Sequence, residues 1–171
     1  MAYKAILEEV LPRIWVGDEE AVPEANRRGY SILAACKDGS SDCHRAVLNY
    51  STLAAPRDKD YYFVQRGNKM ALNLIDSEDP TFIPDEVIDA GLKFLKREYD
   101  AGKKVFCHCV AGKSRSPSLM LAFLRTIGEM PYSFQVSEKV FRTLYSHYDP
   151  ARGIRTHVRE RWAELPTFFK H

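Results

Sequence analysis

Short apolar runs in the first half of the chain predict β-strands. Residues 14–17 and 31–36 form two such runs, and each is bounded by glycine or polar residues. Residues 61–64 and 70–75 flank the turn-forming sequence Arg-Gly-Asn-Lys at 66–69. Two apolar runs on either side of a glycine-containing turn predict a β-hairpin.

Helical spacing of apolar residues dominates the second half. Helices are predicted over residues 84–102, 116–127, 136–144 and 154–165, and a short acidic helix over 18–28. The continuous apolar run at 105–108 is typical of a central strand that is buried on both faces. Strands that alternate with helices before a helical C-terminal half predict an α/β fold, with a central, mostly parallel sheet flanked by helices.

Length and composition favour one globular domain. The chain has 171 residues, of which 45% are hydrophobic and 28% charged, so we expect residues 1–171 to form a single domain. No apolar run approaches the roughly 18 residues that a membrane span needs, and the N-terminus does not resemble a secretory signal. We therefore expect a cytoplasmic monomer, in which the four cysteines are catalytic or buried rather than paired.

The net charge of +2 hides an asymmetry along the chain. Residues 1–90 carry a formal balance of −6, whereas residues 91–171 carry +8. Such an asymmetry can mark an anionic partner. Basic helix surfaces that only contact solvent would give the same balance.

The sequence His-Cys-Val-Ala-Gly-Lys-Ser-Arg-Ser-Pro at residues 108–117 carries the chemistry. It lies between a predicted buried strand and a predicted buried helix, where backbone N–H groups and the positive end of the helix dipole bind anions. Gly112 allows the loop to curl close to a ligand, and Arg115 can hold two phosphoryl oxygens with its planar guanidinium. The helix N-terminus and the cations favour the thiolate of Cys109, which is a nucleophile for a bound phosphate.

This motif resembles the signature of the cysteine-dependent protein tyrosine phosphatases, a Cys separated by five residues from an Arg. Its His, Gly and second Ser match the dual-specificity branch of that superfamily. Residues 13–17, 29–33 and 72–76 are similar to three strand segments of the family, and the C-terminal helices match in order and spacing. The segment 37–69 is longer than the usual loop at this place and has no assigned role.

The resemblance implies a phosphomonoester hydrolase with a cysteinyl-phosphate intermediate. Cys109 would attack phosphorus, and Asp76 would protonate the leaving oxygen, which leaves poorly without a proton. Glu78 and Asp79 are the rival acids, and Asp76 itself could be a solvated loop acid. The implied phosphate-binding residues are Val110, Ala111, Gly112, Lys113, Ser114 and Arg115.

Two neighbours of the motif have implied supporting roles. Ser116 would assist the departure of the thiolate, although a serine at this place also suits a helix N-cap. His108 would orient the loop and support the thiolate, although an isolated histidine is more often structural.

The implied substrate is a phosphorylated protein, dephosphorylated at Tyr as well as at Ser or Thr. A phosphoinositide or an RNA 5′ end is the alternative, because Lys113 would favour highly anionic substrates if it faced the site. A phospho-ligand-binding protein without turnover is a further alternative. A sulfur-transfer or arsenate-reducing enzyme is disfavoured, because arsenate reductases carry their loop near the N-terminus. We expect no DNA partner and no cofactor.

Cys36 ends a predicted strand and is a candidate redox partner. In some relatives a cysteine at the matching strand end bonds to the nucleophile, which suggests a reversible Cys36–Cys109 disulfide; a buried apolar side chain is the alternative. Cys107, His108 and Cys109 do not predict a metal site, because alternate strand residues point to opposite faces and no second ligand pair has zinc spacing. Cys43 carries no recognisable signal.

Overall fold

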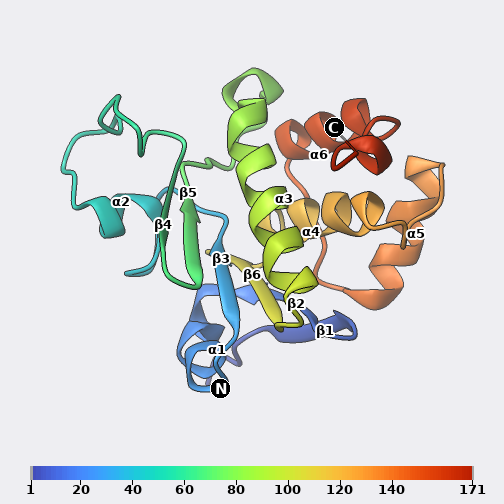
Figure 1. Cartoon of the computed structure of the whole chain (residues 1–171), viewed down its shortest axis with the longest axis horizontal. Helices are drawn as coiled ribbons and strands as arrows, with labels where there is room; N and C mark the ends of the chain where they lie inside the picture. The colour runs from blue at the N-terminus through green and yellow to red at the C-terminus, as the bar shows by residue number, and fades with distance from the viewer. Residues whose placement is uncertain (1, 171) are drawn as a thin grey trace.

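The computed structural model describes residues 2–170, and a six-stranded sheet forms its centre (Figure 1). The strands are β1 Leu7–Leu11, β2 Ile14–Asp18, β3 Ser31–Ala34, β4 Phe63–Arg66, β5 Lys69–Leu72 and β6 Val105–Cys109. They lie in the order β1-β2-β6-β3-β5-β4. The inner pairs β2–β6, β6–β3 and β3–β5 are parallel, whereas β1 and β4 pair antiparallel at the edges. The predicted α/β fold with a mostly parallel sheet and the predicted hairpin are confirmed.

The helices gather largely on one side of the sheet. Within the described residues the α-helices are α1 Val22–Arg27, α2 His44–Leu48, α3 Asp85–Asp100, α4 Arg115–Thr126, α5 Phe134–Leu144 and α6 Arg152–Arg161. Short 3-10 turns are η1 Glu19–Ala21, η2 Pro80–Phe82 and η3 Leu165–Thr167. Figure 1 shows α3 to α6 together, with α1 and α2 apart from them. Among residues 2–170, none of the helices combines the length and apolarity that a bilayer span requires.

Alternate residues of the central strands pack into different layers, because successive side chains point to opposite faces of a sheet. Leu33 and Cys107 pack in the main core with residues of α3 and α4, whereas Ile32 and Phe106 pack with residues of α1. Strand β6 is buried along its whole length, and α4 is buried on nearly all sides, as its apolar composition predicts. The end of β6, at Cys109, is therefore enclosed by protein.

Three local features differ from the expectations. Residues 7–11 form the edge strand β1. Its sequence shows no clear alternation of apolar and polar residues, because only Val10 of these five residues is fully buried. The stretch 37–60, over which the sequence predicts no helix or strand, contains α2. The strands predicted to reach residues 36 and 75 end at Ala34 and Leu72. Beyond these points the chain leaves the sheet and forms loops.

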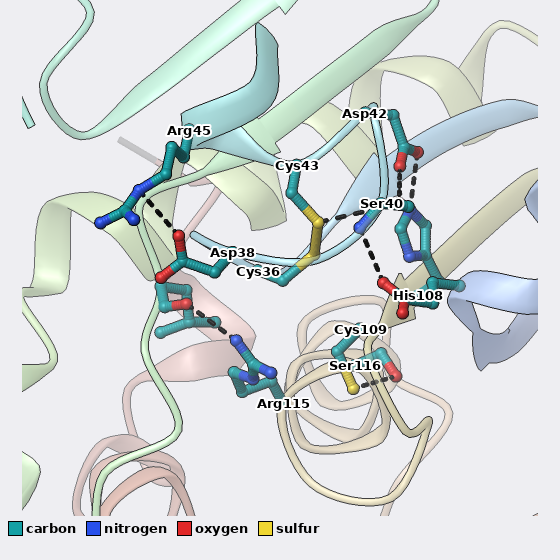
Figure 2. Close-up of a disulfide and its surroundings, with 12 residues drawn as sticks. Cys36, Asp38, Ser40, Asp42, Cys43, Arg45, His108, Cys109, Arg115 and Ser116 are labelled. Atoms are coloured by element: carbon teal, nitrogen blue, oxygen red, sulfur yellow. Dashed lines mark hydrogen bonds and ion pairs between the residues drawn. A yellow bond between two sulfur atoms is a disulfide. The ribbon is translucent and has the colours of Figure 1, made fainter. Parts of the chain in front are cut away.

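Cys36 and Cys43 form a disulfide, with their Cα atoms 5.5 Å apart (Figure 2). The other two cysteines are free and buried. This pairing differs from the suggested Cys36–Cys109 bond and from the expectation of unpaired thiols. The sequence could not show this pairing, because the pairing depends on how residues 37–42 fold back. The fold-back is closed by a hydrogen bond from the His44 N–H to the Cys36 carbonyl at 3.2 Å.

Loss of this disulfide should destabilise the fold. It links residues with a sequence separation of 7, and for so short a loop the chain-entropy relation gives roughly 2 kcal/mol. We expect Cys43→Ala to lower the free energy of unfolding by about 2 kcal/mol in urea denaturation without reductant. The control is the double variant Cys36→Ala/Cys43→Ala, whose stability should not respond to dithiothreitol. Identical unfolding curves for oxidised and reduced wild-type protein would contradict the prediction.

Candidate active site

Residues 109–114, the signature loop, connect the end of β6 to the start of α4. The N-terminus of this 12-residue helix therefore opens onto the loop. Gly112 has φ +70°, and a Cβ placed on it would lie 2.9 Å from the carbonyl of Gly17. Only glycine lets the loop lie so close to β2. The Tyr145 hydroxyl donates to the Gly112 carbonyl at 2.6 Å, and burial raises the pKa of Tyr145, which keeps this donor protonated.

Cys109 lies at the base of the loop and is 2% exposed. Its Sγ is 3.2 Å from Oγ of Ser116, and that hydroxyl lies 3.0 Å from the Gly17 carbonyl, to which it can donate. A hydroxyl has a single hydrogen, so Ser116 can donate to a thiolate only by releasing Gly17. The N-cap of α4 is Ser114, so the alternative reading of Ser116 as the N-cap is wrong.

The guanidinium of Arg115 lines the same cavity as Cys109. Its Nη1 donates to the Leu74 carbonyl at 3.1 Å, which fixes the side chain. Its Nε is buried and has no hydrogen-bond partner among residues 2–170. A buried donor without a partner costs roughly 1–3 kcal/mol. An oxyanion bound in the cavity would satisfy it.

Asp76 lies in the loop after β5, residues 76–79, which we call the acid loop. Its Oδ1 accepts a hydrogen bond from Ser114 Oγ at 2.8 Å. The same Ser114 hydroxyl accepts one from the N–H of Ala151 at 2.9 Å. One side chain thus joins the signature loop, the acid loop and the start of α6. The sequence indicated Asp76 and Ser114 as site residues, but the connection also requires residue 151.

The two rival acids have other partners. Asp79 accepts from the N–H and the hydroxyl of Thr81 at 2.9 and 2.8 Å. These bonds lower the pKa of Asp79, so its carboxylate is a poor proton donor. Glu78 Oε2 accepts from the N–H of Arg152 at 3.2 Å. Asp76 lines the cavity together with Cys109 and Arg115, whereas Asp79 does not, and this placement favours Asp76 as the acid.

The cavity at the signature loop has a volume of about 510 Å³. Its charged lining consists of Lys113, Arg115, Asp76, Glu78 and Asp149. Asp149 carries no signal in the sequence; it reaches the site because its N–H bonds to the Lys113 carbonyl at 2.7 Å. In the part of the chain that the structure describes, no group of three or more His, Cys, Asp or Glu side chains is arranged to hold a metal ion.

His108 and Cys36 lie near the loop but do not line the cavity. His108 is fully buried, and its Nε2 is 2.7 Å from Oδ2 of Asp42. Cys36 belongs to the same buried cluster as Cys109, but it is bonded to Cys43. The segment 37–69 thus contributes a partner for a motif residue, which the sequence did not reveal.

Comparison with solved structures identifies the fold. DUSP15 matches with a TM-score of 0.65 and 16% identity over 95% of this chain and 91% of that chain. The human tyrosine phosphatase-like serine/threonine/tyrosine-interacting protein matches with a TM-score of 0.64 and 15% identity, over 95% of this chain and 99% of that chain. PTPMT1 in complex with PI(5)P matches with a TM-score of 0.62 and 12% identity, over 94% of this chain and 97% of that chain. No protein-family model matches the chain. The chain has the fold of the dual-specificity branch of the cysteine-dependent tyrosine phosphatases, as the sequence resemblance implied.

Proposed function

We propose that the protein is a phosphomonoester hydrolase that forms a cysteinyl-phosphate intermediate on Cys109 and acts on phosphorylated proteins at Tyr and at Ser or Thr. One observation carries the proposal. The same cavity is lined by Cys109, Arg115 and Asp76, and the buried Nε of Arg115 has no hydrogen-bond partner among residues 2–170. These groups supply a nucleophile, an oxyanion binder and a proton donor. The similarity to dual-specificity phosphatase structures supports the proposal.

In the first step the Cys109 thiolate attacks phosphorus, and an S–P bond forms as the P–O bond breaks. The electron pair of the broken bond goes to the leaving oxygen, which takes a proton from the Asp76 carboxyl. Arg115 and the loop N–H groups bind the phosphoryl oxygens. In the second step water attacks phosphorus, and a new P–O bond forms as the S–P bond breaks. The Asp76 carboxylate takes a proton from the water, the electron pair of the S–P bond returns to the Cys109 sulfur, and inorganic phosphate is released. The Ser116 hydroxyl, 3.2 Å from the sulfur, stabilises the departing thiolate by turning its hydrogen bond from the Gly17 carbonyl to the sulfur.

Cys109→Ser should abolish turnover of p-nitrophenyl phosphate, because a serine hydroxyl is far less ionised than a thiol at neutral pH. The Kd for inorganic phosphate, measured by calorimetry, should stay within about threefold because Arg115 is retained. The matched control is Cys107→Ala, two residues earlier in the same buried strand, which should keep its turnover. Full activity of Cys109→Ser would exclude the mechanism. Wild-type protein that binds phosphate without turnover would favour the binding-protein alternative.

Asp76→Asn should lower kcat for an alkyl phosphate by roughly 10²–10⁴, because the leaving alkoxide then receives no proton. The loss should be smaller for p-nitrophenyl phosphate, whose phenolate leaves more readily. Steady-state kinetics on both substrates measure the difference. Asp79→Asn and Glu78→Gln in the same loop are the controls. A strong loss in either of them, with Asp76→Asn unaffected, would assign the acid to that residue instead.

The charges around the cavity favour a single phosphoryl group on a protein. The cations Lys113 and Arg115 share the lining with the carboxylates of Asp76, Glu78 and Asp149. A phosphoinositide with several phosphates would bring further negative charge beside these carboxylates, which is unfavourable. A phosphorylated residue with basic neighbours would complement them.

Phosphotyrosine peptides with Lys or Arg neighbours should have a kcat/KM about three- to tenfold higher than the same peptides with Asp or Glu neighbours at low ionic strength. The preference should shrink at about 0.5 M salt, because exposed charges are then screened. Asp149→Asn should reduce it as well, since Asp149 is exposed at the cavity. Phosphoinositides and 5′-phosphorylated RNA belong in the same panel. A higher kcat/KM for either would point to a non-protein substrate.

A further inference from the structure

The residue that precedes Cys109 is held at both its ring and its backbone. His108 Nε2 lies 2.7 Å from Oδ2 of Asp42, and its ring stacks on Phe106 with centroids 5.6 Å apart. The His108 carbonyl accepts a hydrogen bond from the N–H of Ala35 at 2.7 Å. Ala35 and Asp42 both belong to the chain that follows β3. One short stretch therefore anchors the end of β6.

Asp42 is oriented and charged for this contact. Ser40 Oγ donates to Oδ1 of Asp42, while His108 bonds to Oδ2. Burial by itself raises the pKa of Asp42, but the hydrogen bonds from His108 and Ser40 outweigh it, and the pKa is lowered. An ionised carboxylate can only accept, so the Nε2 hydrogen points at Asp42, and the tautomer and ring plane of His108 are fixed.

The disulfide-closed segment 36–43 also reaches the other side of Cys109. The Ser40 N–H donates to Glu19 Oε2 at 2.7 Å, and the Glu19 N–H donates to the Val110 carbonyl at 3.4 Å. Figure 2 shows the disulfide that closes the segment, with Asp42 directed at His108. The segment therefore contacts the strand end directly, and it contacts Val110, the residue after Cys109, through Glu19.

We propose that Asp42 is a positioning residue for Cys109, held in place by the disulfide-closed segment 36–43. The inference rests on the proposed function, because it takes Cys109 as the nucleophile. Asp42 fixes the ring of His108, the ring fixes the strand end, and the strand end sets the direction of the sulfur. Displacing a reacting group by about 1 Å costs roughly 10²-fold in rate. The longer connection after β3 thus contributes to the alignment of the nucleophile.

The test compares three substitutions at one position. Asp42→Asn and Asp42→Ala should lower kcat for p-nitrophenyl phosphate by up to roughly 10²-fold, the loss expected when a reacting group is displaced by about 1 Å. KM should stay within about threefold, because the groups that bind phosphate are unchanged. Asp42→Glu retains a carboxylate and should recover most of the lost kcat.

Alkylation of Cys109 provides a readout that does not depend on turnover. The rate of its reaction with iodoacetamide at fixed pH, followed by peptide mass mapping, should fall in Asp42→Asn and Asp42→Ala and recover in Asp42→Glu. The matched control is Asp38→Asn in the same segment, whose carboxylate is 57% exposed and pairs with Arg45 instead. Its kcat and its alkylation rate should equal those of the wild type.

Thermal unfolding of the Asp42 variants measures the fraction of folded protein, and this distinguishes an effect on the position of Cys109 from an effect on folding. A loss of activity that matches the loss of folded protein, with wild-type kcat per folded molecule, would overturn the proposal. Wild-type kcat and alkylation in Asp42→Asn would overturn it as well. If Asp42→Asn does not fold, Ser40→Ala tests the same contact, and a kcat and an alkylation rate equal to the wild type would exclude the role. Wild-type protein without turnover, but with alkylation that depends on Asp42, would refute the phosphatase function and keep the positioning role.

Discussion

The backbone of Gly112 lies against the backbone of Gly17, and the space between them does not admit a Cβ. This contact brings the loop before α4 to the end of β2, where Ser116 reaches the Gly17 carbonyl. Tyr145 holds the other side of the loop through the Gly112 carbonyl. A loop fixed in this way keeps its N–H groups and Cys109 in one arrangement without the reorganisation that a flexible loop would need.

The acid loop and the start of α6 behave as one unit against the signature loop. Ser114 bonds to both Asp76 and Ala151. A second contact joins the two segments away from the cavity, because the Gly153 N–H donates to the Ser77 carbonyl at 3.1 Å. A Cβ on Gly153 would lie 2.1 Å from that carbonyl oxygen, so the approach depends on glycine. The position of Asp76 is therefore set by Ser114, 38 positions later, and by Ala151 and Gly153, which follow Asp76 by more than seventy positions.

The sequence predicted what is encoded locally. Continuous burial of β6 and α4 leaves apolar patterns that can be read directly, and one strand-to-helix turn contains both Cys109 and Arg115, so their motif could be recognised. Contacts between polar residues of distant loops leave no periodic pattern. Asp42 pairs with a histidine 66 positions away, and Cys43 pairs through a fold-back of the intervening residues. A short edge strand such as β1 is not predicted from the sequence, because its stability comes from packing against the neighbouring strand rather than from the β-propensity of its own residues.

The bond from Arg115 to the Leu74 carbonyl couples ligand binding to local order. Leu74 is 1% exposed and ends the buried part of the chain just before the acid loop. A ligand that binds Nε of Arg115 restrains the same guanidinium that holds this carbonyl, so ligand binding is coupled to the position of Leu74. By mass action, a ligand at about 100 times its Kd adds roughly 2.7 kcal/mol to the stability of the native state. The local order of the chain just before the acid loop is therefore a function of how fully the cavity is occupied.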